Sequence, residues 1–315
     1  MKVLVTGGAG FIGSHVVDVL LTAGHQVCVV DDLSTGSRDN LAQGVDFYQE
    51  DIRDGRLAEV FRVERPEVVS HQAARANVRE SFDEPLLYTD VNVLGSVNVL
   101  ECCRRYGVRK VIYASTGGAV YGEPQMLPVA EDHPIHPMDP YGAGKHHVEH
   151  YLELYSVNFG IKFTVLRYPN VYGPRQDPNG EAGVVAIFTG QMLRGRQPVI
   201  NGSGDQERDF VHVTDVARAN LLALESGEGE ILNIGCGSGT SVNTIFSVLA
   251  GLTGYRGAAA HGAAKKGEVY KIYLNAERAR RLLGWSPQIP LEEGLASTVR
   301  YFRDRMTAEG RGAGK

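Results

Sequence analysis

The first half of the chain alternates short apolar runs with longer amphipathic runs, and this alternation restricts the fold more than any other feature. Strands that alternate with helices are typical of βαβ units in a parallel sheet. The short runs are rich in Val and Ile with little polar alternation, as expected for strands covered on both faces. We therefore predict an α/β fold with a doubly wound parallel sheet. The predicted strands cover 2–6, 26–31, 46–49, 67–71, 110–115 and 162–167, and helices are expected near 12–23, 54–64, 87–106 and 141–159.

After about residue 170 the pattern loosens. Residues 173–182 and 254–268 are rich in Gly, Pro or Ala and predict loops, whereas 210–224 and 231–236 resemble returns to the sheet. This suggests a smaller, partly inserted second domain that binds the substrate. The predicted division is 1–170 with the returning segments 210–236 for the first domain, 171–209 and 237–306 for the second, and a disordered tail over 307–315.

Composition excludes several classes of protein. The formal charge of −5 argues against a dedicated nucleic-acid-binding protein, and no apolar run approaches the roughly 18 residues of a membrane span. The predicted first strand starts at Lys2, so we expect no signal peptide. The four cysteines have the spacing of neither a zinc site nor a disulfide framework, which favours buried, reduced thiols in a cytoplasmic protein. Gly makes up 38 of 315 residues, an excess that close approach of the backbone to a ligand would explain.

A glycine-rich segment lies between the first predicted strand and the first predicted helix. Gly7, Gly10 and Gly13 follow the pattern G-x-x-G-x-x-G, close to the fingerprint of Rossmann-type dinucleotide-binding domains. The N-terminus of such a helix offers free N–H groups to a phosphate. Asp31, at the end of the second strand, lies where an acid binds the ribose hydroxyls and repels a 2′-phosphate, so we predict NAD over NADP. An ordinary turn acid is the alternative for Asp31.

Tyr141 and Lys145 form a Y-x-x-x-K pair near the start of a predicted helix, with Asp139 as its cap and Pro140 at its first position. Lys145 projects from the same face as Tyr141. We expect its ammonium and the helix dipole to lower the pKa of the phenol, which would make Tyr141 a usable base. A coincidental pair on a helix surface is the alternative.

Two hydroxyl residues, Ser115 and Thr116, end the fifth predicted strand. Side chains at the carboxyl end of a strand face the ligand crevice of an open α/β sheet. Either one could hold a substrate hydroxyl against Tyr141. The alternative is a tight Gly-Gly turn with a capping hydroxyl.

The order of these motifs resembles the extended short-chain dehydrogenase/reductase family, that is, the NAD-dependent epimerase/dehydratase family. Within it the chain is most similar to the UDP-glucose 4-epimerases, from residue 2 to about 302. The motifs are T-G-G-A-G-F-I-G at 6–13, S-T-G-G-A-V-Y-G at 115–122, Y-x-x-x-K at 141–145, R-Y-P-N-V-Y-G-P-R-Q at 167–176 and L-G-W-S-P at 283–287.

The resemblance implies a mechanism and a set of site residues. Tyr141 takes the proton of the sugar 4-hydroxyl while hydride passes from C4 to NAD⁺, the 4-keto sugar rotates about its diphosphate link, and hydride returns to the opposite face. Lys145 binds the nicotinamide ribose, and Asn170 and Arg208 bind the nucleotide diphosphate. For Arg208 the alternative is a surface pair with Asp209 or Glu207. The cofactor residues that the resemblance implies are Gly7, Gly10, Phe11, Ile12, Gly13, Asp31, Asp32, Leu33, Ser34, Thr35, Gly36, Asp51, Ile52, Gln72, Ala73, Ala74, Arg75, Ala76, Asn92, Tyr141, Lys145, Tyr168 and Pro169.

The chain departs from the family pattern at three places. The usual catalytic serine aligns with Gly117, so Thr116 is our substitute and Ser115 the second choice. Lys265, before Glu268, replaces an arginine, and a lysine binds phosphate as a point charge rather than as a fork. We assign Lys265 and Glu268 to the substrate site. Ile272 stands where relatives often carry a bulky ring, which suggests tolerance of an N-acetyl sugar.

Other functions on the same fold stay open. UDP-glucuronate 4-epimerases, 4,6-dehydratases and decarboxylases are the near alternatives, although dehydratases carry Asp and Glu where this chain has Gly117 and Gly118 or Ala119. A non-catalytic NAD-binding sensor is a remote one. His146 and His150 are spaced for a metal, but a solvated helix face explains them better and we predict no metal. The wide apolar faces of the helices near 87–106 and 141–159 suggest a homodimer, with intramolecular burial as the alternative.

Overall fold

The computed structural model describes residues 1–178, 183–264 and 269–312. Its centre is a seven-stranded sheet in the order β11-β6-β5-β4-β1-β2-β3, in which every neighbouring pair is parallel. The order reverses between β1 and β4, and this switch point opens a crevice at the carboxyl ends of the strands. The strands are β1 (Lys2–Thr6), β2 (Gln26–Val30), β3 (Asp46–Tyr48), β4 (Val68–His71), β5 (Lys110–Thr116), β6 (Lys162–Tyr168) and β11 (Glu230–Asn233).

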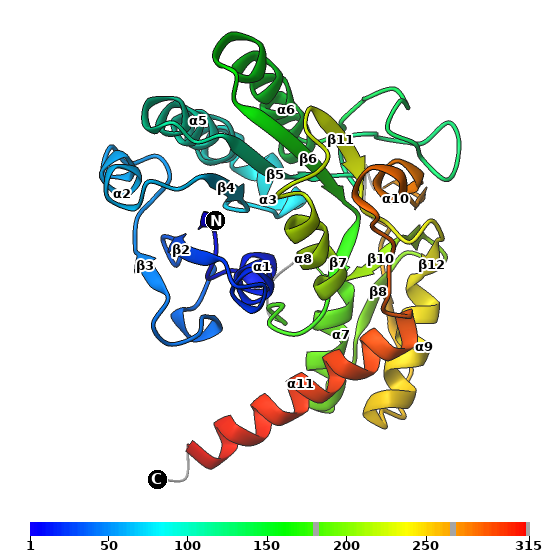
Figure 1. The fold of residues 1–315 in the computed structure, drawn as a ribbon. Helices are drawn as coiled ribbons and strands as arrows, with labels where there is room; N and C mark the ends of the chain where they lie inside the picture. Colours follow the sequence, from blue (N-terminus) through cyan, green and yellow to red (C-terminus); the bar gives the residue numbers. More distant parts are fainter. Residues whose placement is uncertain (179–182, 265–268, 313–315) are drawn as a thin grey trace.

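Helices cover both faces of this sheet (Figure 1), which confirms the predicted doubly wound architecture. Each face has its own apolar core, built from Val, Ile and Leu of the strands and from the inner stripes of the helices. One face carries α1 (Phe11–Thr22), α8 (Val213–Leu222) and α10 (Glu277–Leu283), and the other carries α2 (Leu57–Glu64), α5 (Gly95–Tyr106) and α6 (Pro140–Phe159).

The helix predicted near 87–106 is interrupted in the structure. The chain forms α3 (Val78–Asp83), α4 (Pro85–Thr89) and a π-helical turn η2 (Asp90–Leu94), which leads directly into α5. Such π-turns often accompany functional sites. A short 3₁₀ turn, η1 (Arg38–Asn40), follows β2 and is capped by the Ser37 side chain.

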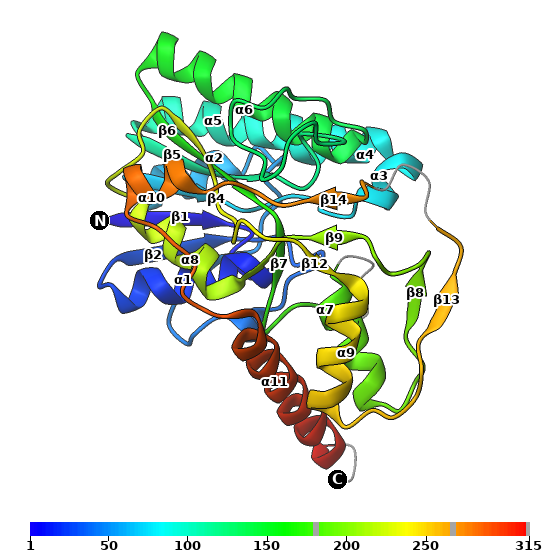
Figure 2. The same cartoon turned by 90° about the vertical axis from the view of Figure 1, so that its right-hand side faces the viewer.

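The remaining elements form a second, smaller layer beside the carboxyl ends of the main strands (Figure 2). Its apolar core is enclosed by α7 (Val184–Leu193), α9 (Val242–Thr253) and α11 (Leu291–Gly312). Short sheets complete the layer: β7 (Asn170–Tyr172) with β10 (Phe210–His212), β8 (Val199–Asn201) with β13 (Ala260–Gly262), and β9 (Glu207–Arg208) between β12 (Thr240–Ser241) and β14 (Lys271–Ile272). The division into two domains stays a prediction, and α10, which falls within the predicted second domain, packs on the main sheet.

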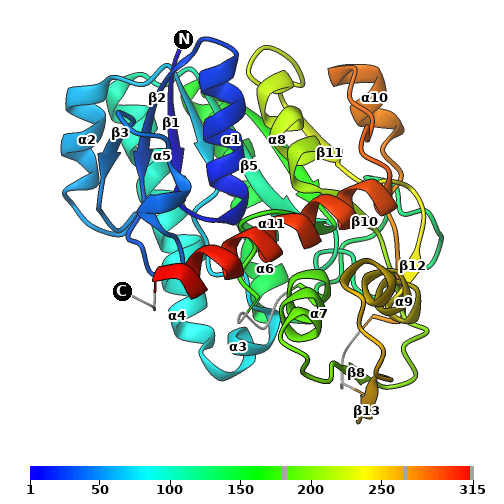
Figure 3. The same cartoon turned by 90° about the horizontal axis from the view of Figure 1, so that it is seen from below.

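Three expectations need correction. Of the two predicted returns, β11 joins the main sheet, but β10 pairs with β7 because β11 already occupies the edge of β6. The tail is not disordered from residue 307, since α11 continues to Gly312 (Figure 3); residues 313–315 lie outside the described part. All four cysteines are unpaired, but Cys236 is only half-buried. Among the described residues no helix is both long and apolar enough to span a bilayer.

Candidate active site

The glycine-rich turn after β1 is so compact that side chains are excluded. Gly7 has a φ of +67°, and a Cβ built on it would lie 2.6 Å from the Ala73 nitrogen; one on Gly13 would lie 2.1 Å from the Gly7 carbonyl oxygen. The turn brings β1, the chain after β4 and the start of α1 together. The free N–H groups at the start of α1 therefore face the crevice, where a phosphate would find them.

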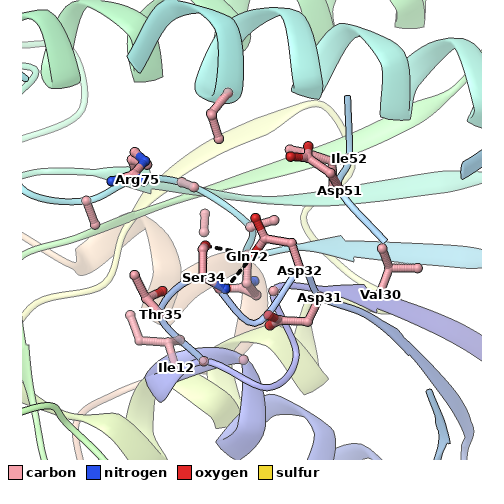
Figure 4. Close-up of a pocket in the computed structure, with 18 of the residues that line it drawn as sticks. Ile12, Val30, Asp31, Asp32, Ser34, Thr35, Asp51, Ile52, Gln72 and Arg75 are labelled. Atoms are coloured by element: carbon pink, nitrogen blue, oxygen red, sulfur yellow. Dashed lines mark hydrogen bonds between the residues drawn. The ribbon is translucent and has the colours of Figure 1, made fainter. Parts of the chain in front are cut away.

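Asp31 lies at the end of β2 and is almost fully buried. Its carboxylate accepts hydrogen bonds from the backbone nitrogens of Ala9, at 2.9 Å, and Leu33, at 2.8 Å. Burial raises the pKa of Asp31, and these two hydrogen bonds oppose the rise. A carboxylate has about four acceptor sites, so it retains capacity for the hydroxyls of a ribose. Asp32 instead accepts from both the nitrogen and the hydroxyl of Ser34 (Figure 4).

A cleft of about 300 Å³ runs along the carboxyl ends of β1, β2, β4 and β5. Most of the cofactor residues implied by the resemblance line it: Gly7, Gly10, Phe11, Ile12, Gly13, Asp31, Asp32, Ser34, Thr35, Asp51, Ile52, Gln72, Ala73, Ala74, Arg75, Ala76, Tyr141, Lys145 and Tyr168. Ser115 lines it as well. The lining is therefore assembled from segments up to about 160 residues apart in sequence, as the doubly wound topology requires.

Four expected cofactor residues lie outside this lining. Leu33 adopts a φ of 61° and points its N–H at Asp31. Gly36 packs against the backbone of Ala9, where a Cβ would come within 2.9 Å. The Asn92 side chain bonds both the nitrogen and the carbonyl oxygen of Arg75, at 2.8 and 2.9 Å, and thereby positions the chain after β4. Pro169 is half-buried next to Tyr168.

Sequence reasoning missed several residues of the cleft. Arg53 is the most informative, because its guanidinium bonds Asp51 and Asp90 and so ties the turn after β3 to η2. Its position directly after Asp51-Ile52 could have suggested it. The others are Val30, Glu50, Leu87, Val91 and Ala114.

Asn220 on α8 also escaped prediction, although it supports the cleft wall from behind. Its side chain accepts a hydrogen bond from Gln72 at 3.0 Å and donates one to the Tyr168 hydroxyl at 2.8 Å. A buried asparagine within the apolar stripe of a helix was the available signal, because a buried amide needs partners.

Tyr141 occupies the first turn of α6. As expected, Asp139 caps this helix by accepting the Gly142 N–H at 2.7 Å, and Pro140 holds the first position. Desolvation raises the pKa of Tyr141, the Asp139 carboxylate adds to the rise, and a hydrogen bond with Thr116 opposes it. The expectation that Lys145 and the helix dipole lower this pKa is therefore wrong for the protein without ligands, because burial and the Asp139 carboxylate raise it.

Lys145 is almost fully buried under the same helix. Its ammonium donates a hydrogen bond of 2.8 Å to the Ala114 carbonyl oxygen. Burial lowers the pKa of Lys145 to about 7, and the Glu149 carboxylate opposes this effect. Lys145 is thus poised between its charged and neutral forms near neutral pH.

The two hydroxyl residues at the end of β5 have different partners. Ser115 donates a hydrogen bond of 2.6 Å to Glu149, which also forms a buried ion pair with Arg167. Thr116 is the residue whose hydroxyl bonds Tyr141. The arrangement places a phenol, an alcohol and an ammonium at one end of the cleft, a set suited to moving a proton on a substrate hydroxyl.

Of the expected substrate residues that the structure describes, Thr116, Asn170 and Arg208 do not line this cleft. Asn170 begins β7, and its backbone nitrogen bonds the Asp209 carbonyl oxygen. Arg208 lies in β9, and its guanidinium bonds the carbonyl oxygens of Glu207 and Tyr270. Ile272 is buried in β14. Lys265 and Glu268 lie outside the described residues.

The histidine pair on α6 shows no metal-binding arrangement. The Nε2 atoms of His146 and His150 lie 3.2 Å apart, and His146 also contacts Glu149. No cluster of His, Cys, Asp and Glu suited to a metal occurs within the described ranges.

The sheet order, the glycine turn, the acid ending β2 and the Tyr141–Lys145 pair define a Rossmann-type dinucleotide-binding protein of the extended short-chain dehydrogenase/reductase class. Comparison with known proteins refines this. Residues 3–235 match the model of the NAD-dependent epimerase/dehydratase family. The chain belongs to this family.

Three of its relatives bear the same name, UDP-glucose 4-epimerase. The UDP-glucose 4-epimerase of Mycolicibacterium smegmatis is 43% identical over 97% of this chain and 99% of its own. The crystal structure of the Thermotoga maritima UDP-glucose 4-epimerase with UDP-glucose is 50% identical, with a TM-score of 0.96 over 97% of this chain and 100% of that one. The Thermus thermophilus UDP-glucose 4-epimerase in complex with NAD is 45% identical, with a TM-score of 0.92 over 96% and 99%.

Proposed function

We propose that this protein is an isomerase, an NAD-dependent 4-epimerase that interconverts UDP-glucose and UDP-galactose through a transient 4-keto sugar. The observation that carries the proposal is the convergence of Tyr141 and Lys145, both from α6, at the end of the cleft that the glycine turn and Asp31 also line. Relatives that share nearly the whole chain and are 43–50% identical have this activity in their names.

The residues of the cleft fit NAD. The glycine turn leaves room for a pyrophosphate at the start of α1, and the Asp31 carboxylate is placed for ribose hydroxyls. When bound, NAD⁺ would supply the hydride acceptor and a positive charge in this cleft. Phe11, Ile12 and Asp51 are the proposed contacts along the cleft, and Tyr168 is the proposed contact near the nicotinamide.

In the proposed reaction Tyr141 removes the proton of the sugar 4-hydroxyl and later returns it. Thr116 forms hydrogen bonds to both the sugar 4-hydroxyl and Tyr141. It thereby keeps these two oxygens close enough for direct transfer of the proton. Lys145 binds the ribose and favours the phenolate by its charge. Ser115 is not proposed to contact the sugar, because its hydroxyl donates its hydrogen bond to Glu149.

Asn170, Arg208 and Lys265 stay proposals for the nucleotide diphosphate of the UDP-sugar, and Glu268 stays a proposal for the substrate site without a contact to the diphosphate. A guanidinium or ammonium suits this charge, since both donate to phosphate oxygens. A 4,6-dehydratase is disfavoured because Gly117, Gly118 and Ala119 offer no carboxylate for the elimination.

We also propose a homodimer formed through α5 and α6. Leu154, Val157 and Phe159 of α6 are exposed apolar residues, and Leu94 is exposed where η2 joins α5. Such a surface is unusual on a monomer when it is contiguous. The unpaired cysteines support a cytoplasmic location.

The test is incubation of the purified protein with UDP-glucose, UDP-N-acetylglucosamine and UDP-glucuronate, followed by quantification of the C4 epimers. We expect UDP-galactose from UDP-glucose, and loss of turnover with retained NAD in Tyr141→Phe. A 4-keto-6-deoxy product, or full activity of Tyr141→Phe, would overturn the proposal.

A further inference from the structure

The Lys145 ammonium is held by groups that the sequence did not indicate. Besides its hydrogen bond to Ala114, its Nζ lies 4.9 Å from the centroid of the Tyr113 ring. This is within the distance at which a cation is attracted by an aromatic face. Because Lys145 is withdrawn from water, such an attraction is stronger than at an exposed site.

Tyr113 is an unexpected residue at its position in β5. It is 1% exposed, and its hydroxyl has no hydrogen-bond partner within the described part of the chain. A buried Tyr hydroxyl usually finds a partner, and leaving it unpaired is unfavourable. The hydroxyl therefore does not explain the residue at this position of β5, whereas the contact of the ring with Lys145 explains why it is aromatic.

We propose that Tyr113 is a positioning residue whose ring face, rather than its hydroxyl, holds the Lys145 ammonium in the cleft beside Tyr141. The inference rests on the proposed function for its catalytic meaning, since Lys145 matters there as a cation. That the Tyr113 ring holds the Lys145 ammonium follows from the contacts of Tyr113 alone and does not depend on the proposed function.

The other groups around Lys145 do not fully account for how its ammonium is held, so the Tyr113 ring contributes significantly. The His71 ring on β4 lies tilted against the Tyr113 ring, with centroids 5.6 Å apart, and burial lowers the pKa of His71 to about 3, so it is neutral. Glu149 attracts the ammonium, but its carboxylate is shared with Arg167 of β6. Tyr141 lies one turn earlier on α6 and is protonated without ligands.

Three acidic groups on other elements packed against α6 bond partners of their own: Glu80 of α3 with Arg75 and Tyr88, Asp90 of η2 with Arg53, and Glu101 of α5 with Arg104 and Tyr155. Glu149 is the charged group that acts on the pKa of Lys145.

The experiment compares Tyr113→Phe, which keeps the ring, with Tyr113→Ile, which keeps strand propensity but removes it. Lysine labelled at Cε with ¹³C is titrated by NMR in the NAD-loaded and unloaded protein, and Lys145→Met assigns the Lys145 signal. We expect an unchanged Lys145 titration in Tyr113→Phe. In Tyr113→Ile we expect its midpoint to fall by about one pH unit, a tenfold change in the protonation equilibrium.

Activity gives a second measurement. The high-pH limb of kcat for UDP-galactose should move to lower pH in Tyr113→Ile and stay in place in Tyr113→Phe. An unshifted titration in Tyr113→Ile, or an equal shift in both variants, would contradict the inference. If Tyr113→Ile does not fold, as judged by circular dichroism, Tyr113→Leu replaces it. A titration shift in a protein that epimerises no UDP-sugar would refute the proposed function but leave the role of Tyr113 intact.

Discussion

The Leu274 side chain occupies the space into which a side chain at Gly117 would project. A Cβ built on Gly117 would lie 2.4 Å from Cδ1 of Leu274, and Leu274 is fully buried. The family resemblance places a serine at position 117. The space left by the absent side chain at the end of β5 is thus filled by a large side chain from the segment after β14.

This match predicts that Gly117→Ser is destabilising. Overpacking of a filled site costs about 1–3 kcal/mol, which urea unfolding would detect. Gly118→Ser is the matched control, because a Cβ there would approach no atom closer than 3.8 Å. In Gly117→Ser/Leu274→Ala the two losses should be clearly less than additive; strict additivity would show that the two side chains do not compete.

Thr116 and Ser115 should respond differently to removal of their hydroxyls. Thr116→Val keeps the shape but loses the bond to Tyr141, and we expect kcat to fall about 100-fold, as for the loss of a hydrogen bond made to the reacting oxygen. Ser115→Ala should cost about 1 kcal/mol of stability through Glu149, with a far smaller change in kcat. The reverse ranking of the two rates would reassign the role to Ser115.

NAD should stabilise the protein and NADP should not. At 100 times the Kd, a bound cofactor adds about 2.7 kcal/mol, visible as a rise in Tm. Asp31→Asn removes the charge that repels a 2′-phosphate. It should therefore reduce the difference between the rise in Tm with NAD and the rise in Tm with NADP. Asp39→Asn is the control, since Asp39 is an exposed acid of η1 outside the lining of the cleft. Equal shifts with NAD and NADP in the parent protein would contradict the role of Asp31.

Glu149 should stabilise the fold in a pH-dependent way. Although burial opposes it, hydrogen bonds from Arg167 and His146 lower the pKa of Glu149 to about 2, against 4.5 for an ordinary glutamate. A carboxylate with a lowered pKa contributes stability above pH 4.5, and this contribution disappears as the pH falls from 4.5 towards 2.

Glu149→Gln should therefore lose about 3 kcal/mol at pH 7, and the difference from the parent protein should shrink at pH 3. Urea unfolding at both pH values measures this. Glu59→Gln, which breaks an exposed pair with Arg62, should leave the stability nearly unchanged at either pH. A difference that does not depend on pH would mean that packing, not charge, explains the loss.

The proposed dimer predicts that a charge at Val157 produces monomers. Val157 is 85% exposed on α6, and Val157→Glu would bury a carboxylate in the proposed interface. Val63→Glu on α2 introduces the same charge on a 53% exposed valine outside it and should leave the assembly unchanged. Analytical ultracentrifugation separates the outcomes, and a monomeric parent protein would end the dimer proposal.

The sequence was a good guide wherever function depends on local spacing. Gly7 and Gly13, Asp31, and Asp139 capping the helix of Tyr141 all follow from turn and helix geometry, so the strands and most of the cleft lining were predictable. Long-range packing was not. Asn220 reaches Gln72 from the far part of the chain, and β10 finds β7 only because β11 takes the edge of β6.

The pKa of Tyr141 shows a second limit of sequence reasoning. A nearby lysine and a helix N-terminus were visible in the sequence, but the extent of desolvation and the approach of Asp139 were not. The partners of Lys145 were equally hidden, because a ring from β5 meets it across the interface between helix and sheet.

The pairing of β11 with β6 also governs the order in which this chain can mature on the ribosome. When residue 169 has emerged, six strands can form, but β6 is a bare edge and α8 is not yet present to cover α1. An unpaired apolar edge is the surface on which neighbouring nascent chains associate. β6 stays unpaired until Asn233 has emerged and β11 can form, so a translational pause between these two points would prolong the exposure of this edge.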